Sequence, residues 1–127
     1  MGRGDAGLKL KVVAVEDDRD FRAILDQWLG SRYEVRLLEN GERLLEELRL
    51  EEPDLVIMDV NLPGPDGFNL CRSIRACPEF RFLPILFLSA QTKDADFIRH
   101  LEAGGTVYLT KPVERRILLS TLGGLAG

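Results

Sequence analysis

Residues 10–18 read LKVVAVEDD, an apolar run that ends in three acidic residues. Similar short runs, rich in β-branched residues, recur along the 127-residue chain at 10–15, 33–38, 55–58, 85–88 and 107–109. Four of them are almost continuously apolar, which is typical of strands buried on both faces of a sheet. The run at 33–38 alternates apolar and polar residues, which predicts a half-exposed strand at a sheet edge.

Helical patterns separate these runs. The first has apolar residues at helical spacing before Gly30, and its members are Phe21, Ile24, Leu25, Trp28 and Leu29. This spacing makes Trp28 a core residue. Further helices are predicted at 41–50 after an Asn40 cap, from Asp66 to before Pro78, around 97–101, and from Pro112 to 122–124. Five strand–helix units predict an α/β fold, a parallel sheet with helices on both faces.

Composition narrows the classes of function. The chain is 45% hydrophobic and 30% charged, as soluble globular domains are, and no apolar run is long enough to span a membrane. Its net charge is −4 and its basic residues do not cluster beyond Arg115-Arg116, so nucleic-acid binding is not expected. The single histidine, His100, excludes a His-based triad and a His-rich zinc site. Cys71 and Cys77 are expected to be free thiols, although a disulfide between them stays open.

Polar residues follow four of the predicted strands. They are Glu16-Asp17-Asp18 after the first, Asp59 after the third, Ser89-Ala90-Gln91 after the fourth and Thr110-Lys111-Pro112 after the fifth. The carboxyl ends of parallel strands meet at one edge of the sheet, which is where ligands bind in such folds. The chemistry is therefore expected at this edge, with Asp18 serving as the cap of the first helix.

Three of these carboxylates should lie close together. Neighbouring strands are about 4.8 Å apart, so Asp59 would nearly touch Glu16 or Asp17. Two like charges about 4 Å apart repel by about 4 kcal/mol at an effective dielectric constant of about 20. A bound divalent cation relieves this repulsion, and oxygen ligands with room for water suit Mg²⁺.

Four segments together resemble the receiver domain of two-component response regulators. They are 12–18 (VVAVEDD), 59–67 (DVNLPGPDG), 87–90 (FLSA) and 108–112 (YLTKP). Each is weakly specific alone, whereas their order and spacing are specific. The resemblance implies a five-stranded sheet with the flavodoxin-like strand order 2-1-3-4-5. It also implies a flexible lead at 1–8, a receiver domain at 9–123, and a C-terminal end or the start of a linker at 124–127.

The resemblance implies a role for each residue at the strand ends. Asp59 would be the phosphoacceptor, an ionised carboxylate that attacks a phosphohistidine of a partner kinase. Asp17 and Asp59 would hold Mg²⁺ directly, with the main-chain carbonyl of Asn61 as a further ligand and Glu16 acting through water. Lys111 would place its charge on the phosphoryl group, and the Lys111–Pro112 peptide bond would be cis.

Switching and phosphate lifetime are implied in the same way. The Ser89 hydroxyl would turn toward a phosphoryl oxygen, and Tyr108 would be the aromatic switch residue, with an ordinary half-buried core ring as the alternative. The altered surface would comprise the fourth helix, the fifth strand and the fifth helix. Asn61 and Gln91 would orient or block the hydrolytic water, being neutral amides that cannot act as bases. Gln91 as an ordinary loop residue stays open.

Three features depart from the family pattern. Residues 104–107 (GGTV) lack the acidic pair that usually precedes the aromatic residue, so this loop is expected to be more mobile. Val113 stands where phenylalanine is frequent. The last helix, with Ile117, Leu118 and Leu119, is apolar on more than one face, which predicts a partner interface or a linker beyond it.

The predicted function is a phosphoacceptor domain served by a sensor histidine kinase or a phosphotransfer protein. Phosphorylation would control an output domain or effector, and a homodimer through the altered surface stays open. The chain would catalyse only its own phosphorylation and dephosphorylation, in the cytoplasm, without contacting nucleic acid or membrane. One alternative is a receiver-like module that phosphorylation does not regulate. The other, a Mg²⁺-dependent phosphatase, is disfavoured because Val60-Asn61 follows Asp59 where a DxD motif is needed.

Overall fold

The computed structural model describes residues 9–90 and 94–126, with side chains described outside 94–96. The predicted lead at 1–8 and Gln91 therefore lie outside the described residues. The elements in chain order are β1 (Leu10–Val15), α1 (Arg19–Leu29), β2 (Tyr33–Leu38), α2 (Leu44–Glu51), β3 (Leu55–Asp59), α3 (Gly67–Arg75), the 3₁₀ turn η1 (Pro78–Phe80), β4 (Ile85–Ser89), α4 (Asp94–Ala103), β5 (Val107–Thr110) and α5 (Arg115–Ala126). No described helix is long and apolar enough to cross a membrane.

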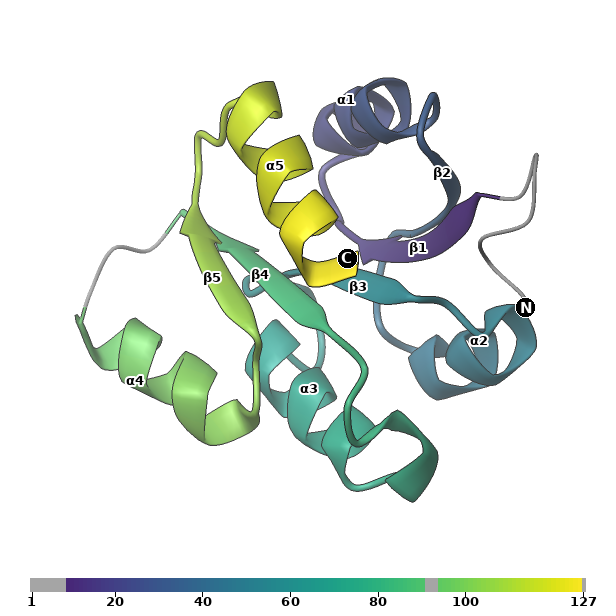
Figure 1. The fold of residues 1–127 in the computed structure, drawn as a ribbon. Helices are drawn as coiled ribbons and strands as arrows, with labels where there is room; N and C mark the ends of the chain where they lie inside the picture. Colours follow the sequence, from purple (N-terminus) through teal and green to yellow (C-terminus); the bar gives the residue numbers. More distant parts are fainter. Residues whose placement is uncertain (1–8, 91–93, 127) are drawn as a thin grey trace.

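The five strands are parallel and lie in the order β2-β1-β3-β4-β5, as expected (Figure 1). Strand β2 lies at one edge, which confirms the prediction from its alternating pattern. Strand β5 forms the other edge, and Val107, Tyr108 and Leu109 are only half-buried. The prediction that this run is buried on both faces is wrong, because an edge strand has a neighbour on one side only.

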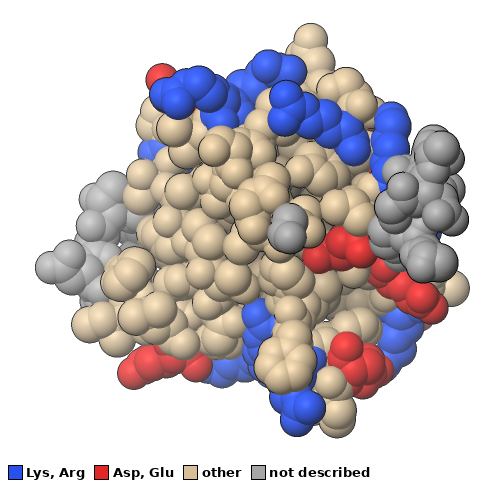
Figure 2. Space-filling model, viewed as in Figure 1, with Lys and Arg blue, Asp and Glu red and all other residues tan. Residues whose placement is uncertain are grey.

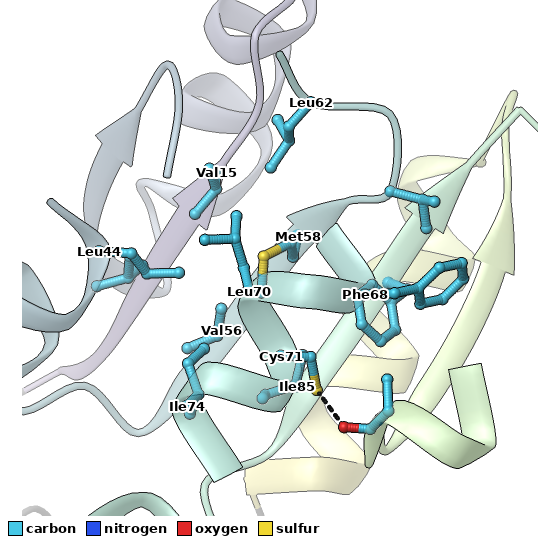
Figure 3. Close-up of a cluster of buried hydrophobic side chains, with 14 of the residues drawn as sticks. Val15, Leu44, Val56, Met58, Leu62, Phe68, Leu70, Cys71, Ile74 and Ile85 are labelled. Carbon is cyan, nitrogen blue, oxygen red and sulfur yellow. Dashed lines mark hydrogen bonds between the residues drawn. The ribbon is translucent and has the colours of Figure 1, made fainter. Parts of the chain in front are cut away.

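Helices α1 and α5 cover one face of the sheet, and α2, α3 and α4 cover the other (Figure 1). Successive residues of a strand point to opposite faces, so Val12 and Ala14 pack toward α1 and α5 while Val13 and Val15 pack toward α2 and α3. Figure 3 shows the cluster on the face covered by α2, α3 and α4, in which Leu70 of α3 lies among residues of the strands. The nearly continuous apolar runs are thus accounted for by two cores, one on each face.

Helices α2 and α5 differ from the predictions in one boundary each, and α1 differs in the burial of one residue. Helix α2 begins at Leu44 instead of residue 41, because the Asn40 side chain accepts a hydrogen bond from Glu42 N (2.9 Å) and caps a preceding turn. Helix α5 continues through Gly123 and Gly124 to Ala126, although both glycines favour an end there. In α1, Leu25 and Leu29 are fully buried whereas Trp28 is only half-buried at the border of the core, so the prediction for Trp28 holds in part.

The loop before β5, which the sequence predicts to be more mobile, makes several hydrogen bonds. Arg75 Nε donates to the carbonyl of Gly104 at 2.8 Å, and Thr106 exchanges hydrogen bonds with Ile85 at 2.8 and 3.0 Å. A Cβ atom at Gly105 would lie 2.3 Å from His100 Nδ1. Glycine is therefore required at 105 because the histidine ring occupies the space of a side chain.

Both cysteines are free thiols, as predicted. The buried Cys71 Sγ donates to the carbonyl of Ala103 at 3.1 Å (Figure 3), and burial raises the pKa of this thiol to about 11. Cys77 is half-buried and lies just beyond the end of α3. The Cys71 thiol thus ties α3 to the end of α4 and does not serve as a ligand or nucleophile.

Candidate functional site

The ends of β1 and β3 bring three carboxylates together. Strands β1 and β3 pair in parallel, with Val15 beside Met58, so the residues that follow each come out at the same edge. Glu16, Asp17 and Asp59 each offer one carboxylate oxygen, and these oxygens lie within 4.8 Å of one another. Glu16 and Asp59 are buried and Asp17 is exposed. The clustering predicted from the sequence is therefore present.

Lys111 binds two of these carboxylates. Its Nζ donates to Glu16 Oε1 at 2.8 Å and to Asp59 Oδ2 at 3.2 Å. The backbone N–H of Lys111 donates to the carbonyl of Ser89 at 2.8 Å, which anchors the lysine to the end of β4. The Lys111–Pro112 peptide bond is cis, as the resemblance implies. The residues at the ends of β1, β3 and β5 thus form one polar site.

Burial sets the electrostatics of this site. Loss of hydration raises the pKa of Glu16 to about 7, although hydrogen bonds from Lys111 and from Asp18 N oppose the shift. For Lys111, burial disfavours the ammonium form, but the hydrogen bond to Glu16 and the charge of Asp59 outweigh burial and raise the pKa. One ammonium among three carboxylates leaves an excess of negative charge, which favours a further cation.

The loop that carries Glu16 and Asp17 is held by helix α1. The Asp18 side chain accepts from Asp20 N at 2.9 Å and from Phe21 N at 3.2 Å, which confirms the predicted cap. Arg22 Nη1 donates to the main-chain carbonyls of Glu16 and Asp17, at 2.8 and 3.0 Å. This role of Arg22 was missed, because nothing in the sequence distinguishes it from a solvated helix arginine.

The remaining predicted residues are distributed around the site. The N–H of Asn61 donates to Asp59 Oδ1 at 3.0 Å, so the loop after β3 fixes the second carboxylate oxygen. Ser89 is fully buried at the end of β4, next to the strand that ends in Asp59. Gln91 belongs to the segment that is not described. Asn61 and Ser89 are thus placed at the same edge of the sheet as the carboxylates.

The Tyr108 ring lies against helix α4. Its centroid is 6.2 Å from that of Phe97 and 5.4 Å from that of His100. His100 is 2% exposed, its ring also contacts Phe87, and its Nδ1 has no hydrogen-bond partner among the described residues. Sequence reasoning missed this histidine as a contact of Tyr108, since its surroundings depend on how α4 docks on β4 and β5.

The residues at the strand ends fit a magnesium ion. Three carboxylates converge there, Lys111 is the one ammonium that pairs with them among the described residues, and all the ligand atoms are hard oxygens. Asp17 is exposed, so its carboxylate is free to turn toward an incoming ion. Asp17, Asp59 and Glu16 would hold the ion.

Comparison with known proteins assigns the family. The response regulator receiver domain matches residues 12–123. The chain is 37% identical over 115 residues to the transcriptional regulatory protein GltR of Pseudomonas aeruginosa, covering 90% of this chain and 48% of that protein. It is 40% identical over 108 residues to AfsQ1 of Streptomyces coelicolor, covering 84% and 47%. The chain thus spans about half the length of these relatives, and it belongs to the response regulator receiver family.

Solved structures agree with this assignment. A putative response regulator from Chloroflexus aurantiacus superposes with a TM-score of 0.88 at 37% identity, covering 93% of this chain and 98% of that one. The receiver domain of sensor histidine kinase PA1611 from Pseudomonas aeruginosa, with a magnesium ion in its active-site cleft, gives 0.86 at 31% identity and coverages of 94% and 98%. Receiver domains are signalling modules that are phosphorylated on an aspartate with Mg²⁺.

Proposed function

We propose that Asp59 is the phosphoacceptor of this receiver domain. The observation that carries the proposal is the pair of contacts from Lys111 Nζ to Glu16 and Asp59, which gathers a nucleophile, a metal-binding acid and a cation at the edge of the sheet. An ionised carboxylate needs no general base, so positioning and charge supply most of the catalysis. The chain would thus promote its own phosphorylation from a phosphorylated donor.

Each residue at the site has a distinct task in this proposal. Asp59 Oδ2 attacks phosphorus in line, a P–O bond forms and the donor leaves with the electrons of the bond that breaks. Lys111 exchanges part of its bonding to Asp59 for a phosphoryl oxygen. Asp17, Asp59 and Glu16 would hold Mg²⁺, whose charge would offset that of the phosphoryl oxygens. Asn61 keeps Asp59 Oδ1 oriented and stands where water approaches the product.

Ser89 and Tyr108 would report phosphorylation to the surface formed by α4, β5 and α5. Helix α4 exposes Phe97, Ile98 and Leu101, and much of the surface over α4 in Figure 2 is uncharged, with acidic residues along its lower border. An apolar surface of this kind fits a second copy of the chain or an output domain. The relatives are about twice as long as this chain, which leaves room for such a domain. A sensor histidine kinase or phosphotransfer protein in the cytoplasm would be the donor.

Incubation with acetyl phosphate and Mg²⁺, followed by intact-mass analysis, tests the assignment of Asp59. The wild type should gain one base-labile phosphoryl group, and Asp59→Asn should gain none. Asp54→Asn is the matched control, since this carboxylate accepts a hydrogen bond from Lys11 N (2.8 Å) before β3 begins, at the opposite end of that strand. An adduct that persists in Asp59→Asn, or its absence from the wild type, would refute the proposal.

Thermal melts test the metal role separately. Without Mg²⁺, Asp17→Asn should melt at the same temperature as the wild type or higher, because it relieves repulsion. Adding Mg²⁺ should raise the melting temperature of the wild type but scarcely that of the variant, since stabilisation by a ligand requires binding. A full Mg²⁺ response in Asp17→Asn would remove Asp17 from the ligand set.

A further inference from the structure

We propose that Phe21 is a positioning residue for Lys111, holding the ammonium group over the phosphoacceptor. This inference rests on the proposed function, because it concerns how Lys111 is held for phosphoryl transfer. Lys111 Nζ lies over the face of the Phe21 ring, 4.8 Å from its centroid. The negative face of a phenyl ring attracts a cation at this distance. Phe21 thus contacts Lys111 from α1, whereas Glu16 and Asp59 bind the same nitrogen from the sheet.

Lys111 needs such a contact because its side chain is flexible. An ammonium group sits at the end of a four-carbon stem and acts as a compact point charge, unlike the planar fork of arginine. The Lys111 side chain is 23% exposed, so water competes for the ammonium group. A ring that covers part of the stem and attracts the charge restricts the nitrogen to the position next to Asp59.

The Phe21 ring is itself held in place from two directions. The Asp18 cap binds Phe21 N at 3.2 Å and fixes the backbone at the first turn of α1. The Trp28 ring meets the Phe21 ring edge to face, with centroids 6.3 Å apart and an interplanar angle of 87°. Together with Pro112 these side chains line an open pocket beside Lys111. The half-buried positions of Phe21 and Trp28, unexpected for core residues, are explained by this pocket.

The ring differs from the other two partners of Lys111 in being neutral. Glu16 and Asp59 change their bonding when a metal ion or a phosphoryl group arrives, and Lys111 must then release part of its contact with Asp59. The Phe21 ring neither titrates nor binds a metal ion, so its own charge distribution does not change when the metal ion or the phosphoryl group arrives. It is therefore the constant contact that keeps Lys111 at the site while the carboxylates exchange partners.

Phosphorylation rates of Phe21 variants test the proposal. The rate constant with acetyl phosphate at saturating Mg²⁺ should fall about threefold to tenfold in Phe21→Leu, which keeps apolar volume but lacks the aromatic face. Phe21→Tyr keeps the face and should stay within about twofold of the wild type. Phe82→Leu is the matched control, because Phe82 also has a cation over its ring, with Arg81 at 5.0 Å. Phe82 is 84% exposed and lies before β4, at the opposite end of the sheet. This substitution should leave the rate constant unchanged.

A second background separates positioning from mere packing. In Lys111→Met there is no cation to hold, so adding Phe21→Leu should change the residual rate by less than about twofold. An equal loss in both backgrounds, or an unaltered rate in Phe21→Leu alone, would overturn the role of Phe21. A wild type that accepts no phosphoryl group would instead overturn the proposed function and the positioning role with it.

Discussion

The two faces of the sheet are packed with different kinds of side chain. Toward α1 and α5 the buried residues are aliphatic apart from Tyr33. Toward α2, α3 and α4 the core includes aromatic rings in sequence: Phe68 lies 5.1 Å from Phe87, Phe87 lies 5.6 Å from His100, and His100 lies 5.4 Å from Tyr108, between centroids. This series runs from α3 through β4 and α4 to β5.

The difference indicates which face can move at lower cost. On the α1–α5 face, Tyr33 is the buried core residue with a polar side-chain atom, whereas the aromatic series contains His100 Nδ1, which has no hydrogen-bond partner among the described residues. Helix α4 also depends on an ion pair, Arg99 to Asp66 at 3.2 Å, in which both side chains are partly exposed. Exposed pairs contribute little to stability. The face that carries Tyr108 is therefore the one suited to a conformational switch.

Matched leucine truncations should give the largest contrast between the faces. Leu118 of α5 is fully buried, and Leu118→Ala should lower the free energy of unfolding by about 3 kcal/mol, through lost burial and a residual cavity. Leu101 of α4 is 57% exposed, and Leu101→Ala should lower it by less than about 1 kcal/mol. Urea unfolding measures both, and equal losses would contradict the contrast between α5 and α4.

The contact between Gly105 and His100 should give the next largest effect. A Cβ at 105 would lie 2.3 Å from His100 Nδ1 and 2.5 Å from Phe87 Cε2, so Gly105→Ala should destabilise the protein by about 1–3 kcal/mol through overpacking. In a His100→Ala background the clash with the imidazole is gone while the approach to Phe87 Cε2 remains, so the cost should be reduced but not abolished. Additive losses in a double-mutant cycle would mean that the two residues do not compete for that space.

Acid should weaken the aromatic face selectively. Burial lowers the pKa of His100, so the folded protein holds the neutral imidazole while the unfolded chain takes up a proton below about pH 6.5. Stability from this group is complete above pH 6.5 and falls as the pH drops through the folded pKa. His100→Leu removes this titration. Between pH 6.5 and 5, the free energy of unfolding of the wild type should therefore fall relative to that of His100→Leu, by at most about 1.4 kcal/mol per pH unit. A gap independent of pH would contradict a neutral buried His100.

Glycine substitutions at the end of α5 should give the smallest change. Gly123 is exposed within the helix and has open space around its Cβ position, so Gly123→Ala should stabilise the protein by up to about 1 kcal/mol. Gly64 also has open space but adopts φ +76°, so Gly64→Ala should destabilise it. Thermal melts of the two variants should shift in opposite directions, and a destabilised Gly123→Ala would indicate that α5 ends before residue 123.

The sequence was sufficient to predict those features of the site that follow from where the strands end. Parallel strands finish at one edge, so Glu16, Asp17 and Asp59 could be placed together from their positions alone. The apolar run of β5 did not by itself predict the strand's exposure, because the run resembles that of a buried strand; the position at the sheet edge follows only from the strand order. The end of α5 could not be predicted either, because packing of Leu122 and Leu125 on the core outweighs the low helix propensity of two glycines.

Contacts that depend on side-chain direction were the least predictable. Arg22 reaches back six residues to the carbonyl of Glu16, and Phe21 meets a lysine from the other end of the chain. Neither contact has a signature in residue type or spacing. Both contacts involve the first turn of α1. The apolar spacing of this helix indicates which residues face the core, but not which contacts the neighbouring residues make.

The unlike surroundings of the two thiols give the protein one convenient attachment point. Maleimides and oxidants react with the thiolate form of cysteine. Cys71 is buried and its pKa is raised to about 11, so almost no thiolate forms there at neutral pH. Cys77 is partly accessible and follows the end of α3, whereas Asp59 lies at the sheet edge where α3 begins. A dye on Cys77 would therefore mark the molecule at a single site, one helix length away from the proposed phosphoacceptor.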